Sequence, residues 1–239
     1  MCTRYLLFER DLDEILKRLG FADSAEFFTR FNIAPSSWLP AVRAKAGTPS
    51  RESVKLRWGL VPSWVKEDVG FKMVNARVET IAEKPAFRDA LKKRRCVIPA
   101  SGFYEWKTAG KIKQPMLVRR RDERPFCFAG LWEAWRAPAG QPLESCTIVT
   151  TEPNELMRTI HNRMPFMLTP EQCEPWLDAS VTDGPKILAL LQPQSAESMS
   201  ATPVSRYVSN VRHEGPECLA PAPPEDVAGD EPQLSLGFE

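Results

Sequence analysis

Cys2 is the residue of this sequence with the most unusual potential chemistry, because it directly follows the initiator methionine. Initiator methionine is normally removed when the second residue is small, and removal would give Cys2 a free α-amine beside its thiol. The pKa of an α-amine is about 7.7–8.0, against about 10.4 for lysine, so much more of it is unprotonated at neutral pH. Such an amine can attack an aldehyde to form a Schiff base, and the thiol can then close a thiazolidine ring. A lone second-position cysteine is more often incidental, so other residues must support this chemistry.

Two further residues could move protons in such a reaction. Glu105 stands among aromatic residues in segment 101–106, on an expected strand, where burial would raise the pKa of its carboxyl group. His161 follows an expected helix and is one of two histidines, so its imidazole could shuttle protons near neutral pH. The alternatives are a glutamate on an edge strand facing water and a surface histidine at a helix end. The sequence alone leaves these alternatives open.

Polar side chains also alternate in one segment that could bind a ligand. In an extended chain Asn75, Arg77 and Glu79 would share one face and offer an amide, a guanidinium and a carboxylate. The alternative is a solvated strand face carrying an Arg–Glu pair.

Two other segments could contact nucleic acid. Bases can stack on exposed rings such as those of segment 57–64, although we expect Trp58 to belong to the core. The basic run 92–95 suits a solvated helix end, or phosphate if it faces the ligand.

The elements that must position these residues are short. Hydrophobic periodicity predicts helices over 11–19, 84–93, 153–160, 170–177 and 184–191, and strands over 53–60, 95–98, 115–119, 125–132 and 145–150. We expect Asp11 to cap the first helix and Gly20 to end it. The pattern predicts an α+β single domain with a curved, partly barrel-like antiparallel sheet flanked by short helices. We expect this domain to span 1–220 and to be followed by a flexible, disordered acidic tail at 221–239.

The formal net charge of +1 averages two unlike parts of the chain. Residues 1–212 hold all 32 Lys and Arg and 24 of the 31 Asp and Glu, a net +8, whereas 213–239 carry −7. A basic body suits a nucleic-acid partner.

Charged residues near the N-terminus and the lack of a long apolar run exclude a signal peptide and a membrane helix, so we expect a cytoplasmic protein. Cysteine spacing and the presence of only two histidines argue against a metal site, and a reducing compartment argues against disulfides. We expect no cofactor, and we expect a monomer because nothing suggests a coiled coil or a repeat.

Six ordered blocks together resemble the SOS-response-associated peptidase (SRAP) family. They are residues 1–4, 31–35, 58–62, 75–80, 102–106 and 161–165, and segments 202–205 and 208–211 resemble the family's closing strand region. The resemblance spans residues 2 to about 220. It implies a sensor of abasic sites in single-stranded DNA, in the DNA-damage (SOS) response, that links its N-terminal cysteine to the sugar aldehyde as a thiazolidine. The word peptidase then reflects removal of what precedes that cysteine. Thr3 and Val65 depart from residues common in the family, glycine and a second tryptophan.

The resemblance also implies a role for each matching residue. Cys2 would be the nucleophile, Asn75 would position the α-amine and the opened sugar, Glu105 would be the acid–base group, and His161 would shuttle protons through the Schiff-base step and its reversal. Contacts to DNA would come from seven residues, with the arginines on phosphates and the proline and tryptophans against bases: Arg4, Pro35, Trp64, Arg77, Trp106, Thr150 and Arg163.

The C-terminal residues carry a separate hypothesis. Gln233, Leu234, Leu236 and Phe238 resemble the peptide by which bacterial proteins bind the DNA sliding clamp, with the apolar three as anchors. The alternative is a chance match in a polar terminus.

Two other functions stay open for the body of the chain. One is an N-terminal-nucleophile thiol peptidase that acts on peptides through the same residues. The other is a non-enzymatic module that binds single-stranded DNA.

Overall fold

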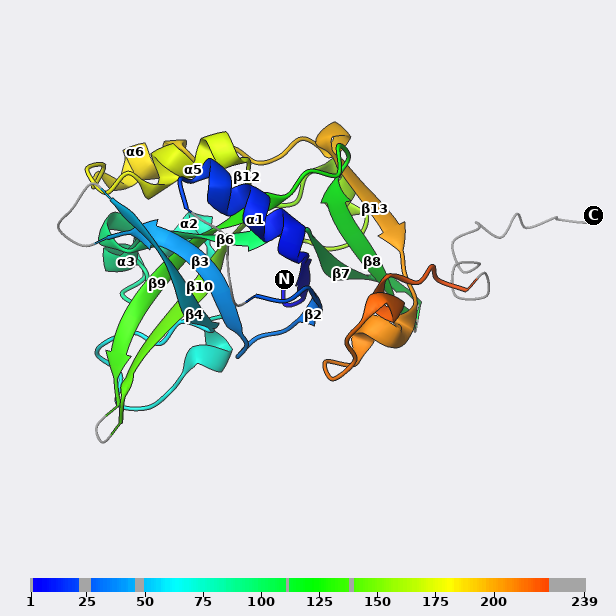
Figure 1. Cartoon of the computed structure of the whole chain (residues 1–239), viewed down its shortest axis with the longest axis horizontal. Helices are drawn as coiled ribbons and strands as arrows, with labels where there is room; N and C mark the ends of the chain where they lie inside the picture. The colour runs from blue at the N-terminus through cyan, green and yellow to red at the C-terminus, as the bar shows by residue number, and fades with distance from the viewer. Residues whose placement is uncertain (1, 22–26, 46–49, 111, 138–139, 224–239) are drawn as a thin grey trace, which may run out of the picture.

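The computed structural model describes residues 2–223, apart from 22–26, 46–49, 111 and 138–139. Its strands form two sheets, one of which closes on itself, and most of the helices lie to one side of the closed sheet (Figure 1). No helix in the described part of the chain combines the length and the apolar character that a membrane crossing requires.

Five strands form the closed sheet, a barrel. In order around the ring they are β10 (Pro142–Thr151), β4 (Arg51–Trp58), β3 (Trp38–Ala44), β6 (Arg95–Ala100) and β9 (Phe126–Arg136), which pairs again with β10. Within this ring β4 and β10 run parallel, and the other neighbours are antiparallel. Three short strands extend it: β5 (Asn75–Arg77) and β11 (Met164–Pro165) pair with β10, and β12 (Met167–Leu168) pairs with β9.

The second sheet is open and antiparallel. Its order is β13 (Met199–Pro203), β8 (Ile112–Arg120), β7 (Gly102–Ala109), β1 (Tyr5–Leu7) and β2 (Arg30–Ile33). The N-terminal strand β1 therefore lies inside this sheet, between β2 and β7. A strand paired on both sides fixes the path of the residues just before it.

Short helices cover the outside of the barrel. Three of them, α1 (Glu9–Arg18), α3 (Arg88–Lys93) and α5 (Pro170–Leu177), contact β6. The other helices are α2 (Val78–Ile81), α4 (Glu155–Arg158) and α6 (Gly184–Ala189), with 3₁₀ turns η1 (Gly70–Lys72), η2 (Ala196–Ser198), η3 (Arg206–Ser209) and η4 (Pro216–Leu219). Helix α1 buries Leu12, Ile15 and Leu16, the apolar stripe that its sequence predicts.

The main core joins the two sheets through Tyr5. Its fully buried ring meets Trp58 and Phe128 edge to face, with centroids 5.6 and 5.5 Å apart. Aromatic pairs of this geometry add about 0.5–1.5 kcal/mol each beyond the area that they bury. The start of the chain is therefore anchored against the barrel, and Trp58 belongs to the core as predicted.

The structure confirms the predicted fold class and most elements, with corrections at several ends. The expected cap Asp11 lies inside α1, because the chain enters the helix at Phe8, whose carbonyl accepts the N–H groups of Asp11 and Leu12. Gly20, with φ of +86°, follows the helix end as predicted. The helix expected over 84–93 begins only at Arg88, because the residues before it form turns in which the Phe87 and Arg88 N–H groups both donate to the Lys84 carbonyl.

The C-terminal part of the domain differs more. The region that resembles the family's closing strand lies partly in a strand: residues 202–203 end β13, which pairs with β8, whereas residues 206–209 form η3. Pro221 bridges to Val204 and the Ala222 N–H donates to the Pro203 carbonyl (3.3 Å), so the chain still packs on β13 where the tail was expected to begin. Residues 224–239, with most of the expected tail, lie outside the described residues.

Candidate active site

Cys2 lies fully buried immediately before β1. Tyr5 pairs with Phe103, and the Tyr104 N–H donates to the Arg4 carbonyl at 2.9 Å. Continued by two residues, this antiparallel register sets Glu105 opposite residue 3, beside Cys2. Glu105 is 3% exposed, and its carboxylate acts electrostatically on the Cys2 thiol, which places the two groups close together.

Asn75 connects Cys2 to the barrel. Its side-chain Nδ2 donates to the Cys2 carbonyl oxygen at 2.8 Å. Asn75 opens β5, which runs parallel to β10 with Asn75 opposite Ile148. The site therefore lies where the open sheet meets the barrel, with Cys2 and Glu105 from one and Asn75 from the other.

His161 is held at the same end of β10. Its Nδ1 accepts the backbone N–H of Arg163 at 3.1 Å, so in the neutral ring the proton is on Nε2. The guanidinium of Arg163 donates twice to the Glu79 carboxylate, at 2.8 and 2.9 Å, and once to the Thr150 carbonyl at 2.9 Å. Since Thr150 pairs with Arg77 across β5, this clamp ties the histidine loop to the strand that carries Asn75.

Burial sets the protonation of the three titratable groups. Desolvation, followed by the nearby Glu105 carboxylate, raises the pKa of the Cys2 thiol. Burial likewise raises the pKa of the Glu105 carboxyl group and lowers that of the His161 imidazole. In each case the uncharged form is favoured, because a low-dielectric site penalises charge. At neutral pH the site therefore favours a thiol and a neutral imidazole, beside a carboxyl group that protonates more readily than usual.

This arrangement provides a nucleophile, an amide donor and two groups able to exchange protons. Among the described residues, no cluster of three or more His, Cys, Asp or Glu could hold a metal ion.

Four of the residues predicted to contact DNA are at least partly exposed to solvent. Trp64 is 65% exposed and Arg77 is exposed, while Pro35 and Trp106 are half-buried. Trp64 lies in the loop between Gly59 and Gly70, whose backbones pack against each other. The Gly70 carbonyl leaves no room for a Cβ on Gly59, and the φ of Gly59 is +119°, so a glycine is required at position 59. The indole of Trp106 donates to Ser209 Oγ at 3.1 Å.

The other predicted contacts lie inside the protein. Arg4 is 7% exposed and its guanidinium donates to the Asn32 Oδ1 and to the Val208 carbonyl, each at 2.8 Å. Arg163 and Thr150 are buried and engaged with each other as described. The sequence reasoning did not single out Asn32, whose amide also donates to the Asn210 and His213 carbonyls; its place inside the 31–35 block was the available signal.

Segment 75–80 is only partly as predicted. Asn75 and Arg77 are on β5, but the chain turns into α2 at Val78, so Glu79 leaves the expected extended face. Its carboxylate pairs with Arg163 rather than with a neighbour in the segment. The Arg163 guanidinium lowers the pKa of the Glu79 carboxyl group, which keeps this pair charged.

A family model supplies the identification of the chain. The model described as SOS response associated peptidase (SRAP) matches residues 1–211. The chain belongs to the SRAP family. The resemblance that the six sequence blocks indicated is thereby confirmed, and it covers the whole site, from Cys2 to the Arg163 clamp.

Relatives match the SRAP chain over nearly its full length. It is 43% identical over 224 residues to the abasic site processing protein YoqW of Bacillus subtilis, covering 92% of this chain and 99% of the relative. The protein YoaM of Bacillus subtilis, also named an abasic site processing protein, is 42% identical, with 92% and 97% covered. A crystal structure of a protein from Bacteroides thetaiotaomicron matches with a TM-score of 0.81 at 26% identity, covering 93% of this chain and all of that one.

Proposed function

We propose that this protein senses abasic sites in single-stranded DNA and binds them covalently through Cys2 after Met1 is removed. The observation that carries the proposal is the enclosure of Cys2 by the Asn75 amide and the Glu105 carboxyl group. The names of the YoqW and YoaM relatives support an abasic-site substrate. Removal of Met1, by the protein itself or by an aminopeptidase, is the peptidase step that the family description suggests.

The proposed reaction balances without any redox partner. An abasic deoxyribose opens to an aldehyde, and the Cys2 α-amine adds to its carbonyl carbon to give a carbinolamine. Loss of water leaves a Schiff base, and the Cys2 thiol then adds to the same carbon. One C–N bond and one C–S bond form, the carbonyl oxygen leaves as water, and the product is a thiazolidine. Reversal follows the same steps with water returning.

Each neighbour of Cys2 has a distinct task in this scheme. Asn75 holds the Cys2 carbonyl, and through it the α-amine, in place for attack. Glu105, whose buried carboxyl group has a raised pKa, protonates the departing oxygen. Neutral His161, with its tautomer set by the Arg163 N–H, exchanges protons during the Schiff-base step and its reversal.

We propose that DNA enters over the exposed part of the site. Arg77 would bind a phosphate flanking the lesion, and Trp64, Trp106 and Pro35 would contact unstacked bases, which stack on aromatic rings with about 1–3 kcal/mol each. Arg4 and Arg163 would act on phosphates only through a local rearrangement, because their guanidinium groups already have internal partners. The net charge of +8 on residues 1–212 favours approach of a polyanion.

The proposal is tested with purified protein and a single-stranded oligonucleotide containing one abasic site. We expect an adduct that survives denaturing electrophoresis, and we expect Cys2→Ala to abolish it. Cys96→Ala serves as the matched control, because Cys96 is another fully buried cysteine, on β6 away from Asn75. A wild-type protein that forms no adduct but cleaves a peptide in trans would instead support a thiol peptidase.

We also propose that the C-terminal peptide with Gln233, Leu234, Leu236 and Phe238 binds the DNA sliding clamp. The protein would then work as a monomer in the cytoplasm, at the replication fork. The support is the spacing of the three apolar anchors in an acidic terminus. Purified clamp should bind the full chain and lose that binding on deletion of residues 233–239. Equal retention by the deletion variant would dispose of this part of the proposal.

A further inference from the structure

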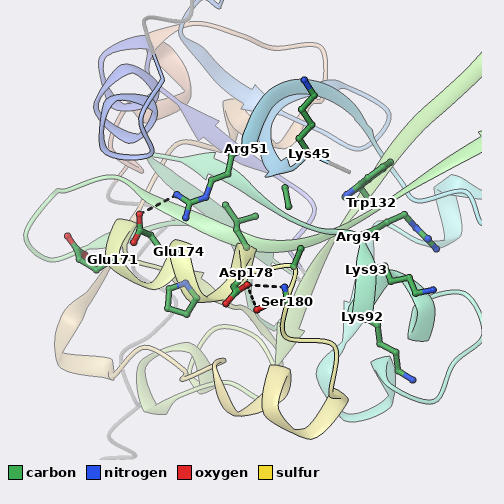
Figure 2. A pocket seen from close by; sticks show the side chains of 14 residues that line it. Lys45, Arg51, Lys92, Lys93, Arg94, Trp132, Glu171, Glu174, Asp178 and Ser180 are labelled. Atoms are coloured by element: carbon green, nitrogen blue, oxygen red, sulfur yellow. Dashed lines mark hydrogen bonds and ion pairs between the residues drawn. The ribbon is translucent and has the colours of Figure 1, made fainter. Parts of the chain in front are cut away.

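A large cavity opens on the barrel away from Cys2, between α3, α5 and the ends of β3 and β4. Its volume is about 1200 Å³. Figure 2 shows Lys92, Lys93 and Arg94 along one wall with Trp132, and Glu171, Glu174 and Asp178 along the opposite wall. We call this the α3–α5 cavity. It shares no lining residue with the site around Cys2.

The charges of the two walls do not cancel, because the acidic side chains already have partners. Glu174 pairs with Arg51 at 3.3 Å and Glu171 pairs with Arg18 at 3.1 Å. The Asp178 carboxylate accepts both the N–H and the hydroxyl of Ser180, at 2.9 and 2.7 Å, and its charge is balanced electrostatically by the nearby Arg95 guanidinium.

The basic wall is different. Lys92 and Lys93 are exposed, and neither has a hydrogen-bond or ion-pair partner among the residues that the structure describes. Arg94 donates to Glu133 at 2.7 Å, so the two lysines carry the uncompensated charge.

Arg95 makes the basic wall rigid. It is 5% exposed and donates to carbonyls at the C-terminal ends of both helices, Leu91 (2.8 Å) in α3 and Trp176 (2.6 Å) in α5. A buried guanidinium that satisfies otherwise orphaned helix carbonyls fixes the two helices relative to each other. The basic run 92–95 therefore divides into one structural residue, Arg95, and side chains that reach the cavity.

We propose that the α3–α5 cavity binds phosphate groups of the DNA strand at a distance from the lesion, with Lys92 and Lys93 as the phosphate ligands. The inference rests on the proposed function, because it takes the crosslinked DNA as the ligand. β6 begins at the cavity and ends at Ala100, and the next N–H, of Ser101, donates to the carbonyl of Leu6 in β1, four residues along the chain from Cys2. At about 3.3 Å per residue, β6 spans about 17 Å and the stretch from Leu6 to Cys2 spans about 13 Å, so the two sites are about 30 Å apart or closer. A strand of several nucleotides spans that distance.

The test measures how non-covalent binding of single-stranded DNA depends on salt. Anisotropy titrations compare a long single strand carrying a tetrahydrofuran abasic analogue, which has no aldehyde, with a pentanucleotide carrying the same analogue at its centre. Each phosphate contact on single-stranded DNA contributes about 0.7 to the slope of log K against log salt. We expect Lys92→Gln/Lys93→Gln to lower that slope by about 1.4 for the long strand. Between about 50 and 200 mM salt, the advantage of the wild type should then shrink about sevenfold.

Two matched variants make the result specific. Lys113→Gln/Lys186→Gln removes the same charge from exposed lysines that do not line the cavity, and should keep the wild-type slope. Lys92→Arg/Lys93→Arg keeps the charge and should also keep it. A slope unchanged in Lys92→Gln/Lys93→Gln, or lowered equally in the control pair, overturns the inference. Adduct formation by the wild type on an abasic pentanucleotide is measured separately. Failure of the phosphate-binding role of Lys92 and Lys93 can therefore be distinguished from failure of the proposed crosslinking function.

Discussion

Replacing Asn75 by alanine perturbs the site through a single hydrogen bond. Its amide is the donor to the Cys2 carbonyl at 2.8 Å, and Cys2 is fully buried. Leaving a buried acceptor unsatisfied costs about 1–3 kcal/mol. If that cost falls on the barrier to amine attack, the rate of adduct formation drops about 5- to 150-fold, at about 1.4 kcal/mol for each factor of ten.

The assay is the initial rate of adduct formation on a single-stranded abasic oligonucleotide, with the protein in excess and the products separated by denaturing electrophoresis. Asp183→Ala is the stability-matched control, because Asp183 caps α6 through the Lys186 N–H at 3.0 Å and a lost cap also costs about 1 kcal/mol. We expect the control to keep the wild-type rate while its melting temperature falls. An Asn75→Ala protein that is folded and reacts as fast as the wild type would refute the positioning role.

Two further predictions concern the groups around Cys2. Because burial raises the pKa of Glu105, the folded state holds its proton more tightly than the unfolded state, so this group reduces stability increasingly as pH rises above about 4.3. The melting temperature of Glu105→Gln should therefore exceed that of the wild type at neutral pH, by about 2–4 °C for each kcal/mol of stability gained. The difference in melting temperature should vanish in acid, and a difference that does not depend on pH would contradict this prediction. Glu79→Gln should loosen the Arg163 clamp and slow both formation and reversal of the adduct severalfold, while binding of undamaged DNA stays unchanged. Rates equal to those of the wild type would show that the clamp does not position His161.

The residues proposed for catalysis stand in ordered blocks of the sequence, and the structure brings Cys2, Asn75 and Glu105 together. Glu105 was expected on a strand among aromatic residues and is buried on β7. A strand containing a proline was missed: Pro40 in β3 removes a ladder donor and reads as a loop. Closure of the barrel depends on β3, so the full ring could not be derived from local periodicity.

The long-range contacts of charged residues were the least predictable part. The Glu79–Arg163 pair joins positions 84 residues apart, and the Arg4–Asn32 bond joins two more segments. Nothing in local spacing distinguishes an arginine that will bind phosphate from one that will be buried against a carboxylate. The basic run 92–95 shows the same limit, since Arg95 is structural while Lys92 and Lys93 face a cavity.

Intact mass measurement of the adduct tests most directly whether Cys2 forms a thiazolidine. The protein without Met1, reacted with an abasic oligonucleotide, should give a species with the summed mass of both less one water. Treatment with cyanoborohydride should leave that mass unchanged, because a thiazolidine has no C=N bond to reduce, and Cys2→Ser should yield an adduct only when the reductant is present. A wild-type adduct that gains two hydrogens on reduction, or one whose linked peptide lacks Cys2, would contradict the account.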